Sequence, residues 1–305
     1  MNQEDSTAPG KTPDQIRLSS EEVDRLFRTG EDYRVLAEKP GGEGLFQEAI
    51  EHYRKAILIG GEGNRAVAQA LSQCAYCLQE TGQIHEALKC YEKLVVLCPA
   101  DQEAWYSRGF VEDEIGSSEL ENSGSDQLSF TAVKYFNSAV HSFAEALNLK
   151  PEDKKCLVML GNVHMSLRNF ENSIHYYHKA LEVEPECTMT HYNIAHVHHS
   201  MACDHETTDP DFVLPNMEKA RNYFKEAIRL NPDYVDAYFN IGICYQDMAL
   251  EYATQQNRTK RSECLRCALN AYNTVISQGD GDTRDDALDA VKQIELDLGV
   301  PSPHS

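Results

Sequence analysis

The stretch that decides the fold is Lys154–Cys187, which reads KKCLVMLGNVHMSLRNFENSIHYYHKALEVEPEC. In its second half, Ser173, Tyr177 and Ala180 follow one another at spacings of four and three residues, which places them on one face of a helix. In its first half, Gly161 lies within a second apolar-periodic segment, where the missing side chain lets a neighbouring helix approach closely. The stretch therefore predicts two packed helices, with the tyrosine ring beside the glycine.

The same arrangement recurs along the chain. Its aromatic member always stands four residues after an Ala or Ser, at Ala49-Tyr53-Ala56, Ala87-Tyr91-Leu94, Ala139-Phe143-Ala146, Ser173-Tyr177-Ala180, Ala220-Phe224-Ala227 and Ala268-Tyr272-Val275. Each copy has an upstream small residue, namely Ala37, Ala75, Gly109, Gly161, Ala195 or Gly242. The middle four copies end at a proline, which stops a helix: Pro99, Pro151, Pro185 and Pro232. Because one helix pair cannot bury its apolar face alone, we expect the six pairs to stack.

This repeat resembles that of the tetratricopeptide repeat (TPR) family, a helix–turn–helix of about 34 residues with small and aromatic residues at these places. The resemblance is clearest in the copies that begin at Lys154 and Asp233. It implies an all-α fold, a right-handed α-solenoid of about six helix pairs plus a C-terminal capping helix. The expected pairs cover residues 30–63, 68–101, 102–153, 154–187, 188–234 and 235–280, and the capping helix covers 283–298.

The ends of the chain and three enlarged copies depart from the regular repeat. Residues 1–18 are polar, so we predict a disordered tail before a solenoid that spans 19–299, and a second tail at 300–305. Ser19 and Glu22 predict a capping box that opens an extra helix. The enlarged copies predict loops at 116–127 and 204–215, and two longer helices joined near Asn257.

The charge balance narrows the expected partners. The net charge is -21, from 49 acidic and 28 basic residues, so phosphates are repelled and we expect neither nucleic acid nor an anionic membrane to bind. A basic protein partner is favoured instead. No apolar run is long enough for a membrane span, and ten cysteines without a secretory signal predict the cytosol or the nucleus.

Several histidines between residues 191 and 205 suggest a metal site, but packing in the core and exposure at the surface explain them more simply. His196, His199 and Cys203 share one helical face, at a spacing that zinc accepts. However, His191 and His198 fall where the repeat places bulky core residues. We therefore interpret these histidines as packing and surface residues, and we expect no metal site.

No catalytic motif is present in the sequence. Two Cys-x-x-Cys pairs, Cys74/Cys77 and Cys264/Cys267, lie inside predicted helices, whereas a zinc ribbon needs tight turns and a redox pair needs a neighbouring strand. We expect these four thiols to be buried. The chain has no phosphate loop, nucleophile elbow or His-Glu-x-x-His sequence. The sequence therefore predicts neither an enzyme nor a cofactor.

The resemblance implies that the first helix of each pair lines a concave groove. The candidate ligand-binding residues on those helices are Asn162, Asn193, His196, Asn240, Gln73 and Ser107. An asparagine amide both donates and accepts hydrogen bonds, so the three asparagines could bind a peptide backbone without reading its side chains. The alternative is that these residues form an ordinary solvated helix face.

Two functions remain open at this stage. The first is an interaction scaffold or adaptor that binds a protein or peptide segment in the groove. The alternative is an acidic dedicated chaperone for a basic client such as a ribosomal protein or histone, whose binding would weaken steeply with salt. We expect no role in holding the acidic tail of heat-shock chaperones, because the cations of that family subset are missing here and Asp236 stands in place of one.

Overall fold

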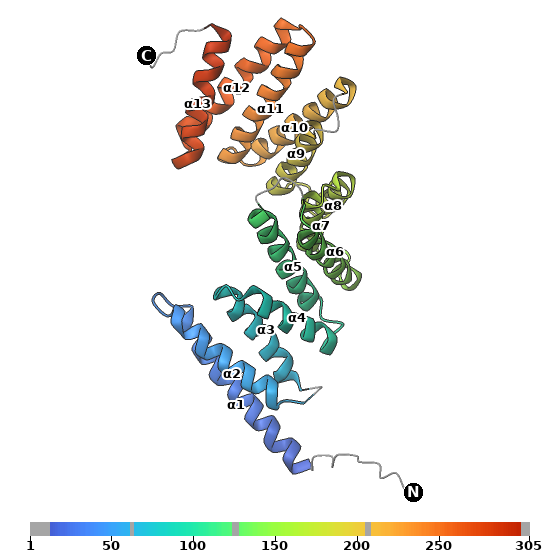
Figure 1. The fold of residues 1–305 in the computed structure, drawn as a ribbon, viewed down its shortest axis with the longest axis vertical. Coiled ribbons are helices and arrows are strands. Elements are labelled where there is room, and N and C mark those ends of the chain that lie inside the picture. The colour runs from blue at the N-terminus through green and yellow to red at the C-terminus, as the bar shows by residue number, and fades with distance from the viewer. Residues whose placement is uncertain (1–12, 62–63, 124–127, 205–208, 300–305) are drawn as a thin grey trace. The chain divides into compact units, whose positions relative to one another are not determined.

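The computed structural model describes residues 13–61, 64–123, 128–204 and 209–299, and all regular structure in these ranges is helical (Figure 1). The α helices are α1 (Pro13–Ala37), α2 (Phe46–Ile59), α3 (Arg65–Glu80), α4 (Ile84–Leu97), α5 (Gln102–Ser123), α6 (Phe130–Leu149), α7 (Lys154–Ser166), α8 (Phe170–Val183), α9 (Thr188–Cys203), α10 (Pro210–Leu230), α11 (Val235–Thr254), α12 (Arg258–Gln278) and α13 (Gly281–Leu298). A short 3-10 helix, η1 (Glu43–Leu45), precedes α2. Within these ranges, no helix has an apolar stretch of the length that a bilayer crossing requires.

The chain forms two compact units, Met1–Pro151 (the N-terminal unit) and Glu152–Ser305 (the C-terminal unit). In the N-terminal unit, α1 packs on α2, α3 on α4 and α5 on α6, and each pair contacts the next. In the C-terminal unit the pairs are α7/α8, α9/α10 and α11/α12, and α13 covers α12. The predicted all-α fold of six helix pairs followed by a capping helix is confirmed.

The close fit of an aromatic ring against a small residue holds the pairs together. A methyl group built on Gly242 would lie 2.7 Å from the ring of Tyr272, and one built on Gly161 would overlap the ring of Tyr177. Both rings are almost completely buried. The prediction that each ring fills the space beside the small residue of its own copy is confirmed in these two pairs.

The first pair uses a different small residue from the one we predicted. Gly30, rather than Ala37, faces Tyr53: a methyl group on Gly30 would lie 2.7 Å from the tyrosine ring. The predicted partner was wrong because α1 is longer than a standard first helix. Ala37, seven residues further on, is buried in the same core.

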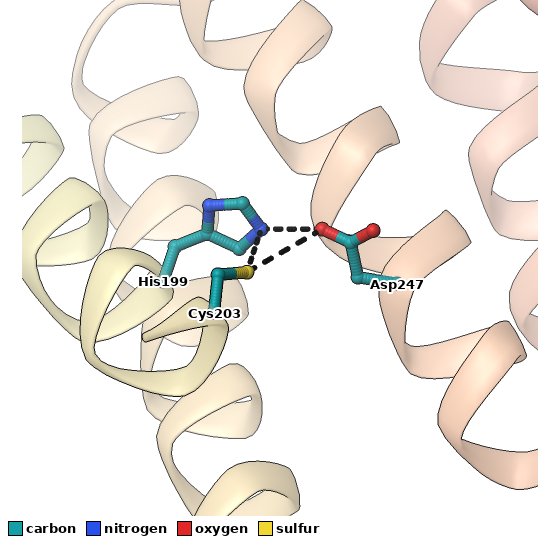
Figure 2. A group of neighbouring side chains, drawn as sticks. All are labelled: His199, Cys203 and Asp247. Carbon is teal, nitrogen blue, oxygen red and sulfur yellow. Dashed lines mark hydrogen bonds and ion pairs between the residues drawn. The ribbon is translucent and has the colours of Figure 1, made fainter. Parts of the chain in front are cut away.

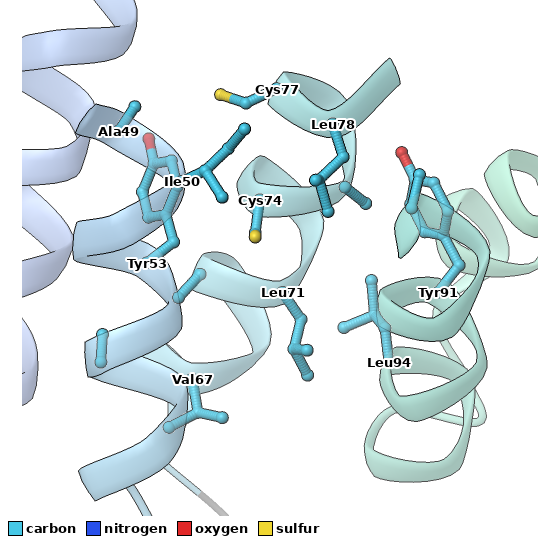
Figure 3. Close-up of a cluster of buried hydrophobic side chains, with 14 of the residues drawn as sticks. Ala49, Ile50, Tyr53, Val67, Leu71, Cys74, Cys77, Leu78, Tyr91 and Leu94 are labelled. Carbon is cyan, nitrogen blue, oxygen red and sulfur yellow. The ribbon is translucent and has the colours of Figure 1, made fainter. Parts of the chain in front are cut away.

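The core of the N-terminal unit is continuous from one pair to the next. Figure 3 shows the buried side chains of α3 between those of α2 and α4, with Leu71 and Cys74 among them. Cys77 is also completely buried. The Cys74/Cys77 pair therefore consists of buried thiols, as predicted.

The predicted loop at 116–127 is wrong for residues 116–123, which continue α5. Gly116 packs closely against Phe136 of α6, since a methyl group on the glycine would lie 2.8 Å from the aromatic ring. This glycine therefore makes another small-against-aromatic contact and is not a turn residue. Residues 124–127 lie outside the described ranges.

The predicted loop at 204–215 is also wrong in its second part, because α10 begins at Pro210. The side chain of Asp209 accepts a hydrogen bond from the backbone N–H of Asp211 at 3.0 Å and so caps the helix. Proline is well tolerated at the first helical position, where its missing N–H costs nothing. In the sixth pair both helices are longer and are joined near Asn257, as predicted. The structure adds that the Asn257 side chain caps α12 by accepting from the backbone N–H of Lys260 at 3.2 Å.

The helix α1 begins at Pro13, so the predicted disordered tail is wrong for residues 13–18. Ser19 lies inside this helix and opens none, which makes the predicted capping box wrong as well. Residues 1–12 and the predicted tail at 300–305 lie outside the described ranges. The capping helix α13 begins at Gly281, two residues before the predicted start at 283.

Candidate functional site

The first helices of the three pairs in the C-terminal unit, α7, α9 and α11, carry a row of asparagines. Asn162, Asn193 and Asn240 (the asparagine row) are each half-buried on one of these helices. The side-chain N–H of Asn193 donates to the Oδ1 of Asn162 at 3.2 Å. The side-chain N–H of Asn240 donates to the hydroxyl of Tyr192, on α9, at 2.9 Å. Side-chain hydrogen bonds thus link the three helices along this face.

The asparagine row keeps unused hydrogen-bonding capacity. The Oδ1 of Asn162 already accepts from Asn193 and from the hydroxyl of Tyr177, the latter at 2.6 Å, whereas its amide nitrogen has only a weak contact with Met159 Sδ at 3.7 Å. Among the described residues, none donates to the Oδ1 of Asn193 or of Asn240. The amide of Asn193 also keeps one of its two N–H groups, so the row offers a bound segment N–H donors on Asn162 and Asn193 and acceptors on Asn193 and Asn240.

The other predicted candidates are divided between the two units. His196 is exposed on α9, one turn beyond Asn193, and its ring lies 6.5 Å from that of Tyr192. Gln73 on α3 and Ser107 on α5 are half-buried in the N-terminal unit. His196 therefore lies in the same unit as the asparagine row, whereas Gln73 and Ser107 both lie in the other unit.

A second group of side chains, which the sequence did not predict as a set, lies between α9 and α11 (Figure 2). The Nε2 of His199 is 2.7 Å from the Oδ2 of Asp247, and the Sγ of Cys203 lies 3.6 Å from Nε2 and 3.8 Å from Oδ2. His199 and Asp247 are partly buried, and Cys203 is exposed. The helical spacing of His199 and Cys203 is visible in the sequence. Their partner Asp247 stands on the next first helix, beyond the reach of helical periodicity.

Sequence-family models match three segments of the chain. A model described as TPR repeat matches residues 216–248, and a model described as tetratricopeptide repeat matches residues 68–101 and 155–187. The chain contains tetratricopeptide repeats. No curated protein sequence matches it.

Solved structures resemble this TPR protein in fold. A tetratricopeptide repeat protein from Parabacteroides merdae is 15% identical, with a TM-score of 0.57 over 90% of this chain and 99% of that one. The MamA protein is 15% identical, with a TM-score of 0.51 over 70% of this chain and 96% of that one. YrrB, described as a TPR protein with an unusual peptide-binding site, is 21% identical, with a TM-score of 0.49 over 80% and 99%. At these identities the likeness extends to the fold alone.

Two histidines of the TPR protein, His164 and His198, fill core positions, which confirms the prediction for His198. The same prediction is wrong for His191, which is only partly buried. His198 is buried, and its Nδ1 lies 3.0 Å from the Oδ1 of Asn216; burial lowers the pKa of this histidine. His164 is also buried, stacks on Tyr176 with ring centroids 5.4 Å apart, and has its pKa lowered by burial. One cysteine differs from expectation: Cys267 is exposed, so the prediction of a buried thiol is wrong there.

The His199–Asp247 pair predicts a pH-dependent stability of the metal-free protein. Burial of the ring acts to lower its pKa, but the hydrogen bonds to Asp247 and Cys203 outweigh burial and raise the pKa to about 9. A raised histidine pKa contributes stability that is complete below the unfolded value of about 6.5 and is lost as the pH rises through 9. We expect a loss of about 3 kcal/mol in the free energy of unfolding over this interval.

Urea denaturation with a chelator present, at about pH 6 and about pH 10, measures this loss. The variant Asp247→Asn removes the carboxylate and should remove the His199 contribution. Apart from Cys203, whose sulfur also contacts Asp247, the ionisable groups keep the same direct contacts in both proteins, so the difference between them reports the group around His199. Equal pH profiles for the two proteins would contradict the assigned interaction.

Proposed function

We propose that this TPR protein is an interaction scaffold that binds an extended segment of a partner protein across α7, α9 and α11. The observation that carries the proposal is the asparagine row. Its three half-buried amides stand on successive first helices and are held in place by hydrogen bonds within the protein. They keep unused N–H donors on Asn162 and Asn193 and unused acceptors on Asn193 and Asn240. Anchored side chains lose little conformational freedom when a ligand binds, which favours affinity.

Hydrogen bonds to backbone groups suit a ligand in extended conformation. The N–H groups of such a segment would donate to Asn193 and Asn240, and one of its carbonyls would accept from Asn162. These contacts select for an exposed backbone and leave the side chains of the ligand to be read by the residues around the row.

The surroundings of the row favour a segment with both apolar and basic residues. The rings of Tyr192 and Tyr234 lie 5.0 Å apart beside the row, and Met189 is 52% exposed one turn before Asn193. Asp236, one turn before Asn240, is exposed and negatively charged. Apolar side chains of the ligand can therefore pack on the tyrosines and methionine, and a Lys or Arg can pair with the aspartate.

Selection from a displayed random-peptide library against the full chain, followed by fluorescence anisotropy with the selected peptides, tests the proposal. Each of the substitutions Asn193→Ala and Asn240→Ala should weaken binding about tenfold, because each removes one buried hydrogen bond to the peptide. The matched control is Asn222→Ala, an exposed asparagine on α10 in the same unit, which should bind as the wild type does. Peptides that bind all three variants with wild-type affinity would refute a role for the row.

The salt dependence of the same peptides separates the scaffold from the acidic chaperone. Contacts through neutral amides and apolar side chains predict only a small loss of affinity as ionic strength rises. A steep loss, together with insensitivity to Asn193→Ala, would instead favour charge-driven binding of a basic client over the acidic surface.

A further inference from the structure

We propose that His199, Cys203 and Asp247 form a zinc-binding site that joins α9 to α11. The three donors are an imidazole nitrogen, a thiolate sulfur and a carboxylate oxygen, and each is a common zinc ligand. Soft thiolate disfavours magnesium and calcium, which prefer all-oxygen sites. Among the described residues this is the only group of three or more such side chains whose ligand atoms lie within 4.8 Å of one another.

The distances from the Cys203 sulfur to the other two ligand atoms match those expected around a tetrahedral zinc ion closely. The distance between the His199 nitrogen and the Asp247 oxygen matches less closely. Zinc–ligand bonds of about 2.0–2.3 Å at tetrahedral angles place sulfur about 3.6 Å from both the nitrogen and the oxygen, and place nitrogen about 3.4 Å from oxygen. The Sγ of Cys203 lies 3.6 Å from Nε2 and 3.8 Å from Oδ2. The imidazole–carboxylate separation of 2.7 Å has to open by several tenths of an ångström.

The helices supply these ligands with little reorganisation. His199 and Cys203 are four residues apart on α9, so they share one face, and Asp247 approaches them from α11 (Figure 2). The backbone of both helices is fixed by the packing of α9 and α11 on α10. A site that is already formed loses little entropy when the ion binds.

Electrostatics also favour a divalent cation at this place. A thiolate and a carboxylate together carry two negative charges, which one zinc ion neutralises, and the whole chain carries a net charge of -21. Without metal, a proton on His199 pairs with Asp247, and binding of zinc releases that proton together with the thiol proton of Cys203. Cys203 is exposed, so the ion can enter and the fourth coordination position is open to water.

The site differs from the histidine–cysteine set that periodicity alone suggests. His196 lies one turn before His199 on α9 but outside the group of converging atoms. The structural proposal therefore requires Asp247 and does not require His196. These two side chains give the proposal its sharpest test.

Titration of the full, reduced chain with cobalt(II), a spectroscopic substitute for zinc, tests the site. We expect a thiolate-to-cobalt charge-transfer band in the near ultraviolet that saturates at one ion per chain. Cys203→Ser should abolish the band, whereas Cys267→Ser, which removes the exposed thiol of α12, should leave it unchanged. Zinc should displace the cobalt.

The affinity for zinc, measured by competition with a chromophoric chelator, distinguishes the two possible ligand sets. His199→Asn and Asp247→Asn should each weaken zinc binding at least about tenfold, and His196→Asn should not. Circular dichroism of each variant verifies that the helices remain folded. The proposal would be overturned if the wild type showed no charge-transfer band or if Cys203→Ser kept the full band. It would also be overturned if zinc affinity fell with His196→Asn but not with Asp247→Asn. The outcome is independent of whether the asparagine row binds a peptide.

Discussion

Replacing Tyr177 by alanine should lower the free energy of unfolding of the C-terminal unit by about 4 kcal/mol. The ring is 2% exposed and packs directly on Gly161, so its removal leaves a cavity between α7 and α8. Its hydroxyl also donates to the Oδ1 of Asn162 at 2.6 Å, and that hydrogen bond disappears with the ring. Urea denaturation followed by circular dichroism measures the change. Trp105, the single tryptophan, lies in the N-terminal unit, so its fluorescence reports the unfolding of that unit separately.

Two further variants show whether the effect arises from the fit between ring and glycine. Tyr176→Ala removes a neighbouring tyrosine of α8 that is only partly buried, and it should cost clearly less. Gly161→Val should destabilise the wild type by overpacking but be tolerated in the Tyr177→Ala background, where the space is empty. If the two substitutions were additive, the ring and the glycine would not be a packing pair.

The second large effect is expected from Glu112→Leu in the N-terminal unit. Glu112 is 1% exposed and accepts three hydrogen bonds, from Arg108 Nε at 3.0 Å and from the hydroxyls of Ser138 and Ser142 at 2.6 Å each. The leucine removes the acceptor and leaves the buried Ser142 hydroxyl without its partner. An unsatisfied buried polar group and lost hydrogen bonds to a charged group together predict a cost of about 3 kcal/mol.

The fluorescence of Trp105, in the same unit, measures the lowered free energy of unfolding of Glu112→Leu during urea denaturation. Glu114→Leu, an exposed glutamate two residues along α5, is the matched control and should change the free energy of unfolding little. Combining Glu112→Leu with Ser138→Ala and Ser142→Ala removes the stranded hydroxyls and should recover part of the stability. A Glu112→Leu protein as stable as the control would mean that the carboxylate network is not a source of stability.

The repeat was predictable because it depends on local spacing. Tyr177, Ser173 and Gly161 recur in equivalent form along the chain, and each position relates to its neighbours by helical periodicity. The same spacing placed Asn193 and Asn240 on equivalent positions of successive first helices, and Asn162 one turn further along its own helix. The structure joins Asn162 and Asn193 by a hydrogen bond.

The sequence predictions were wrong or incomplete where the role of a residue depends on a partner that is distant in the sequence. Gly116 stands in a polar, Gly- and Ser-rich segment that resembles a loop, but the ring of Phe136 on the next helix gives it a packing role. Asp247 is far from Cys203 in sequence, and no local pattern relates them. Cys267 follows the same Cys-x-x-Cys spacing as Cys77, yet it faces solvent. The burial of a small residue is set by the neighbouring helix, which periodicity within one helix does not reveal.

Photo-crosslinking shows directly whether a partner segment binds along the first helices of the C-terminal unit. A photoreactive amino acid replaces Met189, which is exposed beside the asparagine row on α9, or Asn222, which is exposed on α10. We expect a library-selected peptide to crosslink to the full chain from position 189 and not from position 222. Crosslinking from position 222 alone would place the ligand on the second helices and contradict this expectation.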